Sequence, residues 1–369
     1  MKVAVPWPQH SQRLGHWASS QTVTSFKSVI SDFVDQNAGL FGSRTLIQGG
    51  FLSRCNAGSI FIFGPQLLIW REPSPAGDAG KAENGEEFQF PPTRPLFTLC
   101  GVNSAPLGFF DSGVGGLTVV RAVQELLPAE DILYLGDTAR LPYGSKSPET
   151  IRHFADEDVR FLISKGVKAV VVACNTATAH ALPQLCEHYR IPILGVIEPG
   201  VEAALACPDA ERIGIIATRG TIGSHAYQHA LALRKTGLII HSQATPLLVP
   251  LIEENWIEHP ATRLVLKAYL DPLVEKGMDT LLLACTHYPL LIPVLKELLP
   301  AHIRLVDSAT TCAEHLKKEL TRLDLLQSEA REGSLELYLT DLSEAFESLA
   351  RQFLKKSPGR IRRAVLGGL

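Results

Sequence analysis

The alternation of apolar strands with amphipathic helices, which begins near residue 106, most constrains how this chain can fold. Apolar runs such as "LGFFD" (107–111), "KAVVVAC" (168–174) and "DTLLLAC" (279–285) are each followed by a stretch with helical spacing of its apolar residues. Continuously apolar strands that alternate with helices predict parallel sheets covered by helices on both faces. The alternation restarts after Pro199, and 369 residues are enough for two domains. The sequence therefore predicts an α/β fold with parallel sheets.

Several polar residues and two cysteines fall where the predicted strands end. In parallel α/β sheets, ligands bind at the carboxyl ends of the strands, so these positions are candidates for a functional site. The residues at these ends are Asp111, Asp137, Cys174, Thr218, Cys285 and Asp307.

Cys174 and Cys285 occupy matching positions, because each ends an apolar run with Ala-Cys and precedes a helix. A free Cys is often simply a buried core residue, so two buried strand ends are one interpretation. A helix N-terminus, however, lowers the pKa of a thiol, and two matched thiols favour a two-base reaction. One thiolate takes a proton from one face of a carbon, and the other thiol returns a proton to the opposite face. A cysteine hydrolase needs only one thiol and leaves the second unexplained.

Other motifs give weaker indications. The turn "SGVGG" after Asp111 differs from a dinucleotide-binding fingerprint, because Thr118 stands where the last Gly is expected. His225 and His229 have the spacing of a zinc-protease helix, but Ala226 replaces the catalytic Glu, which favours a solvated helix face. We therefore expect neither a metal nor a cofactor.

Composition excludes other classes. The net charge of −3 argues against nucleic acid as a partner, since such proteins usually present a basic face. No apolar run approaches the roughly 18 residues that span a bilayer, and the N-terminus lacks the apolar core of a signal peptide. Seven irregularly spaced cysteines do not form a disulfide framework. We expect a cytoplasmic protein that binds no membrane.

Residues 1–105 differ from the rest of the chain. They show no sustained apolar period, and residues 71–95 are rich in Pro, Gly and charge, as linkers are. Met1 and Met278 are the two methionines of the whole chain, so an upstream start codon is one explanation for this segment. We expect an N-terminal extension that is disordered or not native.

Six motifs in order resemble those of glutamate racemases: "GFFDSGVGGLTVVRAV", "PYGSKS", "VVVACNTATA", "PLIEE", "LLLACTHYPLL" and "LVDSA". The match covers about residues 107–323, and His287 follows the second Cys-Thr, where aspartate and hydantoin racemases typically have Glu. The resemblance implies cofactor-independent interconversion of L- and D-glutamate, which supplies D-glutamate for peptidoglycan synthesis. The residues that it places against the amino acid are Asp111, Ser112, Tyr143, Gly144, Asn175, Thr176, Thr218, Thr221, Thr286 and His287.

The resemblance also assigns catalytic roles. Cys174 abstracts the α-proton of the D-enantiomer and Cys285 that of the L-enantiomer. The residues that assist the thiols are Asp111, Glu253 and His287. Asn255 stands where relatives often have Gly, which puts the conformation of that loop in question.

For the domains, the resemblance implies two pseudo-symmetric three-layer α/β domains with the active site in the cleft between them. The first comprises residues 106–197 and 307–369, and the second comprises residues 198–306. We also expect a homodimer. Two alternatives stay open: a racemase of aspartate or another amino acid, and a non-catalytic regulator that binds an amino acid.

Overall fold

The structure, a computed structural model, describes residues 103–343 and 346–367, together with the backbone of four strands between residues 43 and 70. The chain divides into two units, Met1–Thr93 and Arg94–Leu369. Each is described by itself.

The first unit contains an antiparallel sheet of order β1-β2-β3-β4. Its strands are β1 (Ser43–Ile47), β2 (Gly50–Cys55), β3 (Gly58–Phe63) and β4 (Gln66–Trp70). These strands add regular structure to a segment for which the sequence indicated none. Residues 71–95 lie outside the described residues, and the expectation about them stays a prediction.

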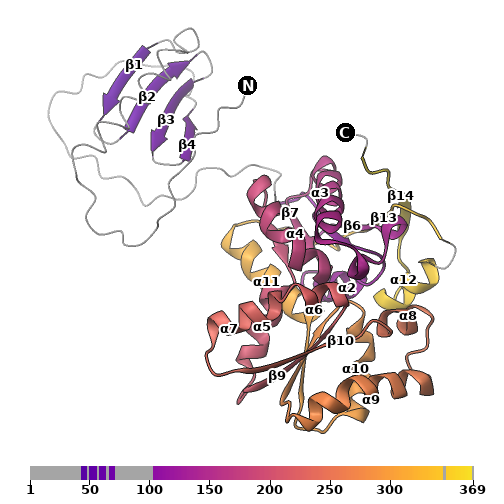
Figure 1. The fold of residues 1–369 in the computed structure, drawn as a ribbon. Helices are drawn as coiled ribbons and strands as arrows, with labels where there is room; N and C mark the ends of the chain where they lie inside the picture. Colours follow the sequence, from indigo (N-terminus) through magenta and orange to yellow (C-terminus); the bar gives the residue numbers. More distant parts are fainter. Residues whose placement is uncertain are drawn as a thin grey trace. The chain divides into compact units, whose positions relative to one another are not determined.

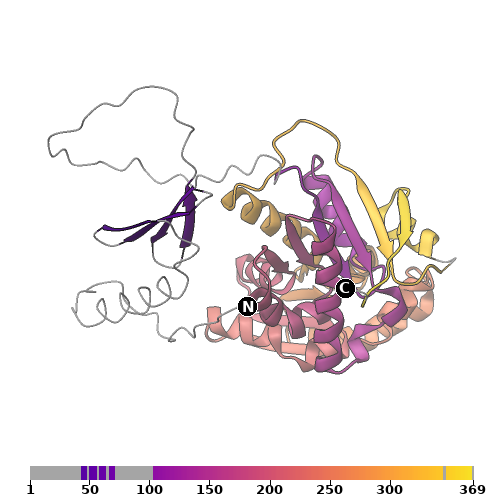
Figure 2. The ribbon, with the colours of Figure 1, turned by 90° about the horizontal axis from the view of Figure 1, so that it is seen from above.

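The second unit contains two parallel sheets. The larger has the order β14-β13-β6-β5-β7-β8, and the smaller has the order β10-β9-β11-β12. The strands of the larger sheet are β5 (Leu107–Asp111), β6 (Ile132–Gly136), β7 (Ala169–Val172), β8 (Ile193–Gly195), β13 (Leu335–Leu339) and β14 (Arg360–Arg363). Those of the smaller sheet are β9 (Arg212–Ala217), β10 (Ile239–Ala244), β11 (Thr280–Ala284) and β12 (Arg304–Asp307). The late strand β13 lies beside the early strand β6, and β14 lies beside β13 at the edge of the sheet (Figures 1 and 2), so the chain returns to its first sheet after completing the second.

Helices follow most strands, which confirms the predicted α/β fold. The helices of the first half are α2 (Leu117–Leu126), α3 (Pro148–Ser164), α4 (Asn175–His188), α5 (Ile197–Ala206), α6 (Arg219–Gly223) and α7 (Ala226–Arg234). The later helices are α8 (Leu248–Glu253), α9 (Pro260–Glu275), α10 (Ile292–Leu298), α11 (Ser308–Arg322) and α12 (Phe346–Leu354). The described residues also contain the 3-10 turns η2 (Thr138–Arg140), η3 (Tyr143–Ser145) and η4 (Tyr288–Leu291). Helix α3 begins at Pro148, because the hydroxyl of Ser147 accepts a hydrogen bond from the Thr150 amide, 3.3 Å away.

The core explains why the central strands are apolar throughout. Every residue of β5, β7 and β11 is buried, since helices cover both faces of each sheet. One continuous apolar cluster contains Phe109 of the larger sheet and Leu283 of the smaller one, with helices α2 and α11 contributing to it. The two sheets therefore share a core, and this core fixes how their strand ends meet.

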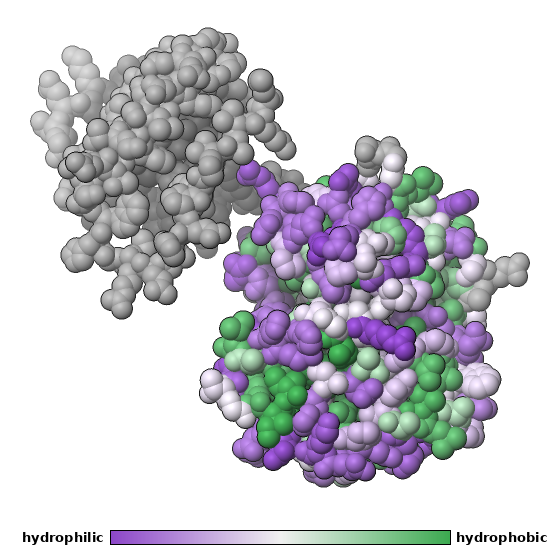
Figure 3. All heavy atoms as spheres, viewed as in Figure 1, coloured by the Kyte–Doolittle hydropathy of each residue, from purple (hydrophilic) through white to green (hydrophobic). Residues whose placement is uncertain are grey.

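The surface of the second unit is mixed. Figure 3 shows hydrophilic residues interspersed with separate hydrophobic patches on the face in view. In the described part of the chain, no helix is both long enough and apolar enough to cross a bilayer.

Candidate active site

The two predicted thiols lie at equivalent places in the two sheets. Cys174 follows β7 and caps helix α4, where its sulfur accepts a hydrogen bond from the Ala177 amide at 3.5 Å and lies 3.9 Å from the Ser112 hydroxyl. Cys285 directly follows β11, and each cysteine is only 6% exposed. The segment after β5 contacts both thiol segments, because the Ser112 hydroxyl lies 3.9 Å from the Cys174 sulfur and the Thr118 hydroxyl donates to the carbonyl of Thr286, the residue after Cys285, at 2.7 Å. The structure thus brings both thiols to one site.

The helix N-terminus does not dominate the chemistry of Cys174. Burial, with the negative charge of Asp111, raises the pKa of this thiol to about 12, although the Ala177 amide acts in the opposite direction. The expectation of a lowered pKa is therefore wrong for Cys174, because loss of hydration outweighs one hydrogen bond. At neutral pH this residue carries its proton.

Asp111 offers a free acceptor inside the site. The residue ends β5, is 1% exposed, and accepts a hydrogen bond from the Gly113 amide through Oδ2 at 3.0 Å. Its other oxygen, Oδ1, is buried and has no partner among the described residues. Burial raises the pKa of Asp111, while the charge of His287 opposes the shift. A buried oxygen without a partner is suited to accept a hydrogen bond from a bound ligand.

His287 links Cys285 to Glu253. Its Nδ1 lies 3.9 Å from the Cys285 sulfur and 3.4 Å from the Thr286 hydroxyl, and its Nε2 lies 2.9 Å from Glu253 Oε1. Burial lowers the pKa of His287, but the hydrogen bonds and charges of Cys285 and Glu253 outweigh it and raise the pKa to about 10. The imidazole is therefore protonated at neutral pH and places positive charge beside the sulfur.

Three threonine hydroxyls form a cluster across the two sheets. Thr176 at the start of α4 lies 2.9 Å from Thr218 and 3.1 Å from Thr221, measured between their Oγ1 atoms. Thr218 ends the segment after β9 and caps α6 by accepting from the Thr221 amide at 3.3 Å. These hydroxyls connect the segment after β7 to the segment after β9. Their hydrogen bonds to one another can be replaced by hydrogen bonds to a ligand.

The tyrosine of "PYGSKS" points away from this group. Its hydroxyl donates to the carboxylates of Asp137 and Asp158, and the Tyr143 side chain is fully buried. Gly144 lies against Thr218, since a Cβ on this glycine would come within 2.8 Å of the threonine Cβ. The side chain of Tyr143 is therefore engaged within the protein, and a larger residue in place of Gly144 would overlap Thr218.

The side chain of Asn175 is engaged within the protein. Its Oδ1 accepts from the Tyr227 hydroxyl at 2.6 Å, and its Nδ2 lies 3.5 Å from the Ser308 hydroxyl. Sequence reasoning missed both partners, because α7 and α11 are remote from Asn175 in the chain. Tyr227 belongs to none of the six motifs, and Ser308 lies in "LVDSA" without any signal that links it to Asn175. The Asn175 backbone, at the first turn of α4, stays available.

Two further residues that support the second thiol were not predicted as site residues. The Thr118 hydroxyl donates to the Thr286 carbonyl at 2.7 Å. A Cβ on Gly115 would lie 2.3 Å from the Thr286 hydroxyl oxygen and 2.4 Å from His287 Nδ1. The run "SGVGG" carried this signal, since a glycine there allows the turn after β5 to touch the residues after β11.

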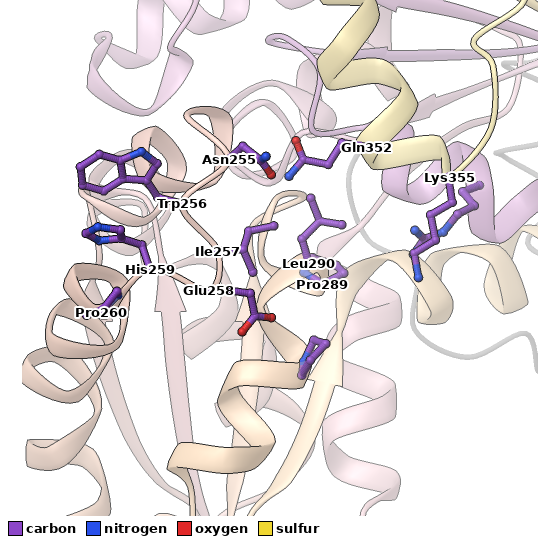
Figure 4. A pocket seen from close by; sticks show the side chains of 12 residues that line it. Asn255, Trp256, Ile257, Glu258, His259, Pro260, Pro289, Leu290, Gln352 and Lys355 are labelled. Atoms are coloured by element: carbon purple, nitrogen blue, oxygen red, sulfur yellow. The ribbon is translucent and has the colours of Figure 1, made fainter.

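The loop that follows Glu253 keeps the conformation that glycine favours. Asn255 has φ of 57°, in the left-handed region, which Asn tolerates better than most residues. This loop also borders a hollow of about 790 Å³. Figure 4 shows Asn255, Trp256 and Ile257 on one side of the hollow, and Gln352 of α12 with Lys355, which follows α12, on another. None of the predicted site residues lines it, because the thiols and their neighbours are themselves buried.

The histidine pair of α7 stands apart from these residues. The rings of His225 and His229 lie 6.0 Å apart. Within the described ranges, no group of three His, Cys, Asp or Glu side chains could hold a metal ion.

Comparison with known proteins places this arrangement in a family. Residues 115–316 match the model of the Asp/Glu/Hydantoin racemase family. A glutamate racemase from Neisseria meningitidis serogroup C is 45% identical over 264 residues, which cover 71% of this chain and 97% of the relative.

Solved structures agree with this match. The chain resembles glutamate racemase from Francisella tularensis in complex with D-glutamate, with a TM-score of 0.67 and 34% identity over 71% of this chain and 98% of the other. It also resembles a glutamate racemase from Bacillus anthracis, with a TM-score of 0.69 and 37% identity over the same shares. This chain belongs to the Asp/Glu/Hydantoin racemase family.

Proposed function

We propose that this chain is a glutamate racemase, an isomerase that interconverts L- and D-glutamate by proton transfer between two cysteines. The observation that carries the proposal is the pair of buried thiols, Cys174 after β7 and Cys285 after β11, at equivalent strand ends of the two sheets. The glutamate racemases to which the chain is similar support glutamate as the substrate.

The two thiols divide the work of proton transfer. In the L-to-D direction, the Cys285 thiolate takes the α-proton, and the Cys174 thiol gives its own proton to the opposite face of the carbanion. The raised pKa of Cys174 suits it to begin as the acid. The protonated His287 stabilises negative charge on the neighbouring Cys285 sulfur. The reverse direction exchanges the two roles.

Binding of the amino acid uses the groups that the fold leaves ready. The unpartnered Oδ1 of Asp111 accepts a hydrogen bond from the ammonium group. The hydroxyls of Thr176, Thr218 and Thr221 and the first backbone amides of α4 donate to carboxylate oxygens and to the developing negative charge. Because the site is buried, these dipoles act without competition from water. The mechanism uses no group beyond the chain itself.

The test is α-proton exchange. Purified protein is incubated with L-glutamate in deuterium oxide, and both optical rotation and α-deuterium uptake are followed. We expect racemisation with deuterium incorporation and no added cofactor. Absence of both from folded protein would refute the proposal, and a parallel reaction with aspartate that runs faster would reassign the substrate.

Three broader proposals accompany this function. We propose that D-glutamate made in the cytoplasm is used for peptidoglycan, and that the protein is a homodimer, which light scattering would test. We also propose the domain limits 106–197 with 307–369, and 198–306. The separate sheet orders support the limits, because β13 pairs with β6 and β14 pairs with β13, whereas neither pairs with β12.

A further inference from the structure

The aromatic ring of Phe353 contacts the imidazole of His287. The two ring centroids lie 5.2 Å apart, and the ring planes meet at 85°, an edge-to-face arrangement. Phe353 is fully buried and belongs to α12, which follows β13 and precedes β14 in the chain. A residue near the end of the chain thus touches the histidine beside the second thiol.

The other contacts of His287 leave one motion weakly restrained. Nδ1 faces Cys285 and Nε2 binds Glu253, so polar contacts hold the two nitrogens of the ring. Both polar contacts act at the ring nitrogens. They therefore only weakly restrain rotation of the ring plane about the line that joins Nδ1 and Nε2. Gly115 borders the Cε1–Nδ1 edge, and the Phe353 ring packs against the imidazole, so these apolar neighbours oppose the tilt.

The position of Phe353 is itself fixed by its helix. Its carbonyl oxygen accepts a hydrogen bond from Arg121 Nη1 of α2 at 3.1 Å. Helix α2 begins just after the turn that follows Asp111 and contains Gly115. Phe353 is therefore held by the same helix that supports the other half of the site.

We infer that Phe353 is a positioning residue, which holds the His287 imidazole in the tilt that directs Nδ1 at the Cys285 sulfur. The inference deepens the proposed function and rests on it, since Cys285 is one of the two proton-transfer groups. Phe353 acts through His287 and does not touch the reacting atoms.

The decisive variant is Phe353→Leu, with Phe346→Leu as the matched control. Phe346 lies on the same helix and is 3% exposed, but it makes no ring contact with His287 in the described part of the chain. Both changes remove an aromatic ring from the same apolar cluster. Thermal melts of both variants show whether the fold is kept, and Phe353→Met is a second substitution if Leu does not fold.

The first readout separates the two thiols. A glutamate analogue with a β-chloro group needs one base, because the thiolate takes the α-proton and chloride leaves with its electron pair. We expect Phe353→Leu to slow elimination from the L-analogue, served by Cys285, roughly 10- to 100-fold, as small misplacements of catalytic groups do. Elimination from the D-analogue, served by Cys174, should stay close to wild type. Equal losses for both analogues, or an equal loss in Phe346→Leu, would overturn the inference.

The second readout does not depend on activity. The pKa of His287 is measured by NMR, with His287→Asn identifying its resonance. A freed ring makes weaker bonds to Cys285 and Glu253, so Phe353→Leu should lower this pKa while Phe346→Leu leaves it unchanged. An unchanged pKa in Phe353→Leu would contradict the inference. If wild-type protein neither exchanges nor eliminates, the proposed function fails, and this pKa alone decides the positioning role.

Discussion

Replacing Glu253 with Gln should lower the pKa of His287 without displacing its ring. The amide keeps an oxygen at the position of Oε1, 2.9 Å from Nε2, but removes the negative charge. The neighbouring residue Glu254 is exposed, so Glu254→Gln is a matched control that removes a charge from the same segment.

The size of the effect follows from the kind of hydrogen bond that is lost. A hydrogen bond that involves a charged group contributes about 1.5–3 kcal/mol, with an ion pair near the upper end and an imidazolium bonded to a neutral amide near the lower end, so the change costs the imidazolium roughly 1.5 kcal/mol. One pKa unit corresponds to about 1.4 kcal/mol. The pKa of His287, raised to about 10 in the native protein, should therefore fall by about one unit.

The sign of the pH dependence follows from the same shift. The pKa of His287 is raised above its ordinary value of 6.5, so its contribution to folding stability is complete below that pH and is lost as pH rises through about 10. Racemisation should also fall at alkaline pH, because His287 loses its charge there. In Glu253→Gln, both this fall and the loss of stability should begin about one pH unit lower than in wild type.

Three measurements check this prediction: an NMR titration of His287, a pH series of thermal melts, and kcat/KM for L-glutamate against pH. Glu254→Gln should reproduce wild type in all three. If the fall of kcat/KM at alkaline pH begins at the same pH in folded Glu253→Gln as in wild type, the Glu253 carboxylate does not maintain the charge of His287, and the argument is refuted.

Three further predictions concern the thiols, the glycine turn and the extension. Cys174→Ala and Cys285→Ala should each abolish racemisation while keeping β-elimination from one enantiomer of a chloro analogue, and near-normal racemisation by either would contradict the two-base mechanism. Gly115→Ala should lower kcat/KM at least about 100-fold, because its Cβ would overlap the residues beside the second thiol. Gly223→Ala, whose Cβ meets nothing within 4 Å, is its control, and equal activity of the two would refute the steric argument. A chain that starts at residue 102, with Met substituted, should keep its thermal midpoint within a few degrees and its racemisation rate, and a large loss of either would show that the extension contributes to the fold.

The predictions that came from sequence concern features that are local in the chain. The signals in the apolar runs, in Ser147 and in the two Ala-Cys ends each act within a few residues. Strand ends, the start of a helix and the matching positions of Cys174 and Cys285 could therefore be predicted. The order of the motifs was sufficient to indicate the family. Even Asn255 followed a local rule, since the backbone there needs the left-handed conformation that Asn tolerates.

Some properties of a residue depend on neighbours that several helices and strands supply, and only the tertiary structure decided these. The pKa of Cys174 rises because the assembled core removes water, although the helix N-terminus by itself favours the opposite shift. Asn175 binds Tyr227, and Thr118 binds Thr286, through contacts between segments that are remote in the chain. Such contacts are set by how two sheets share one core, and no spacing along the chain encodes that distance.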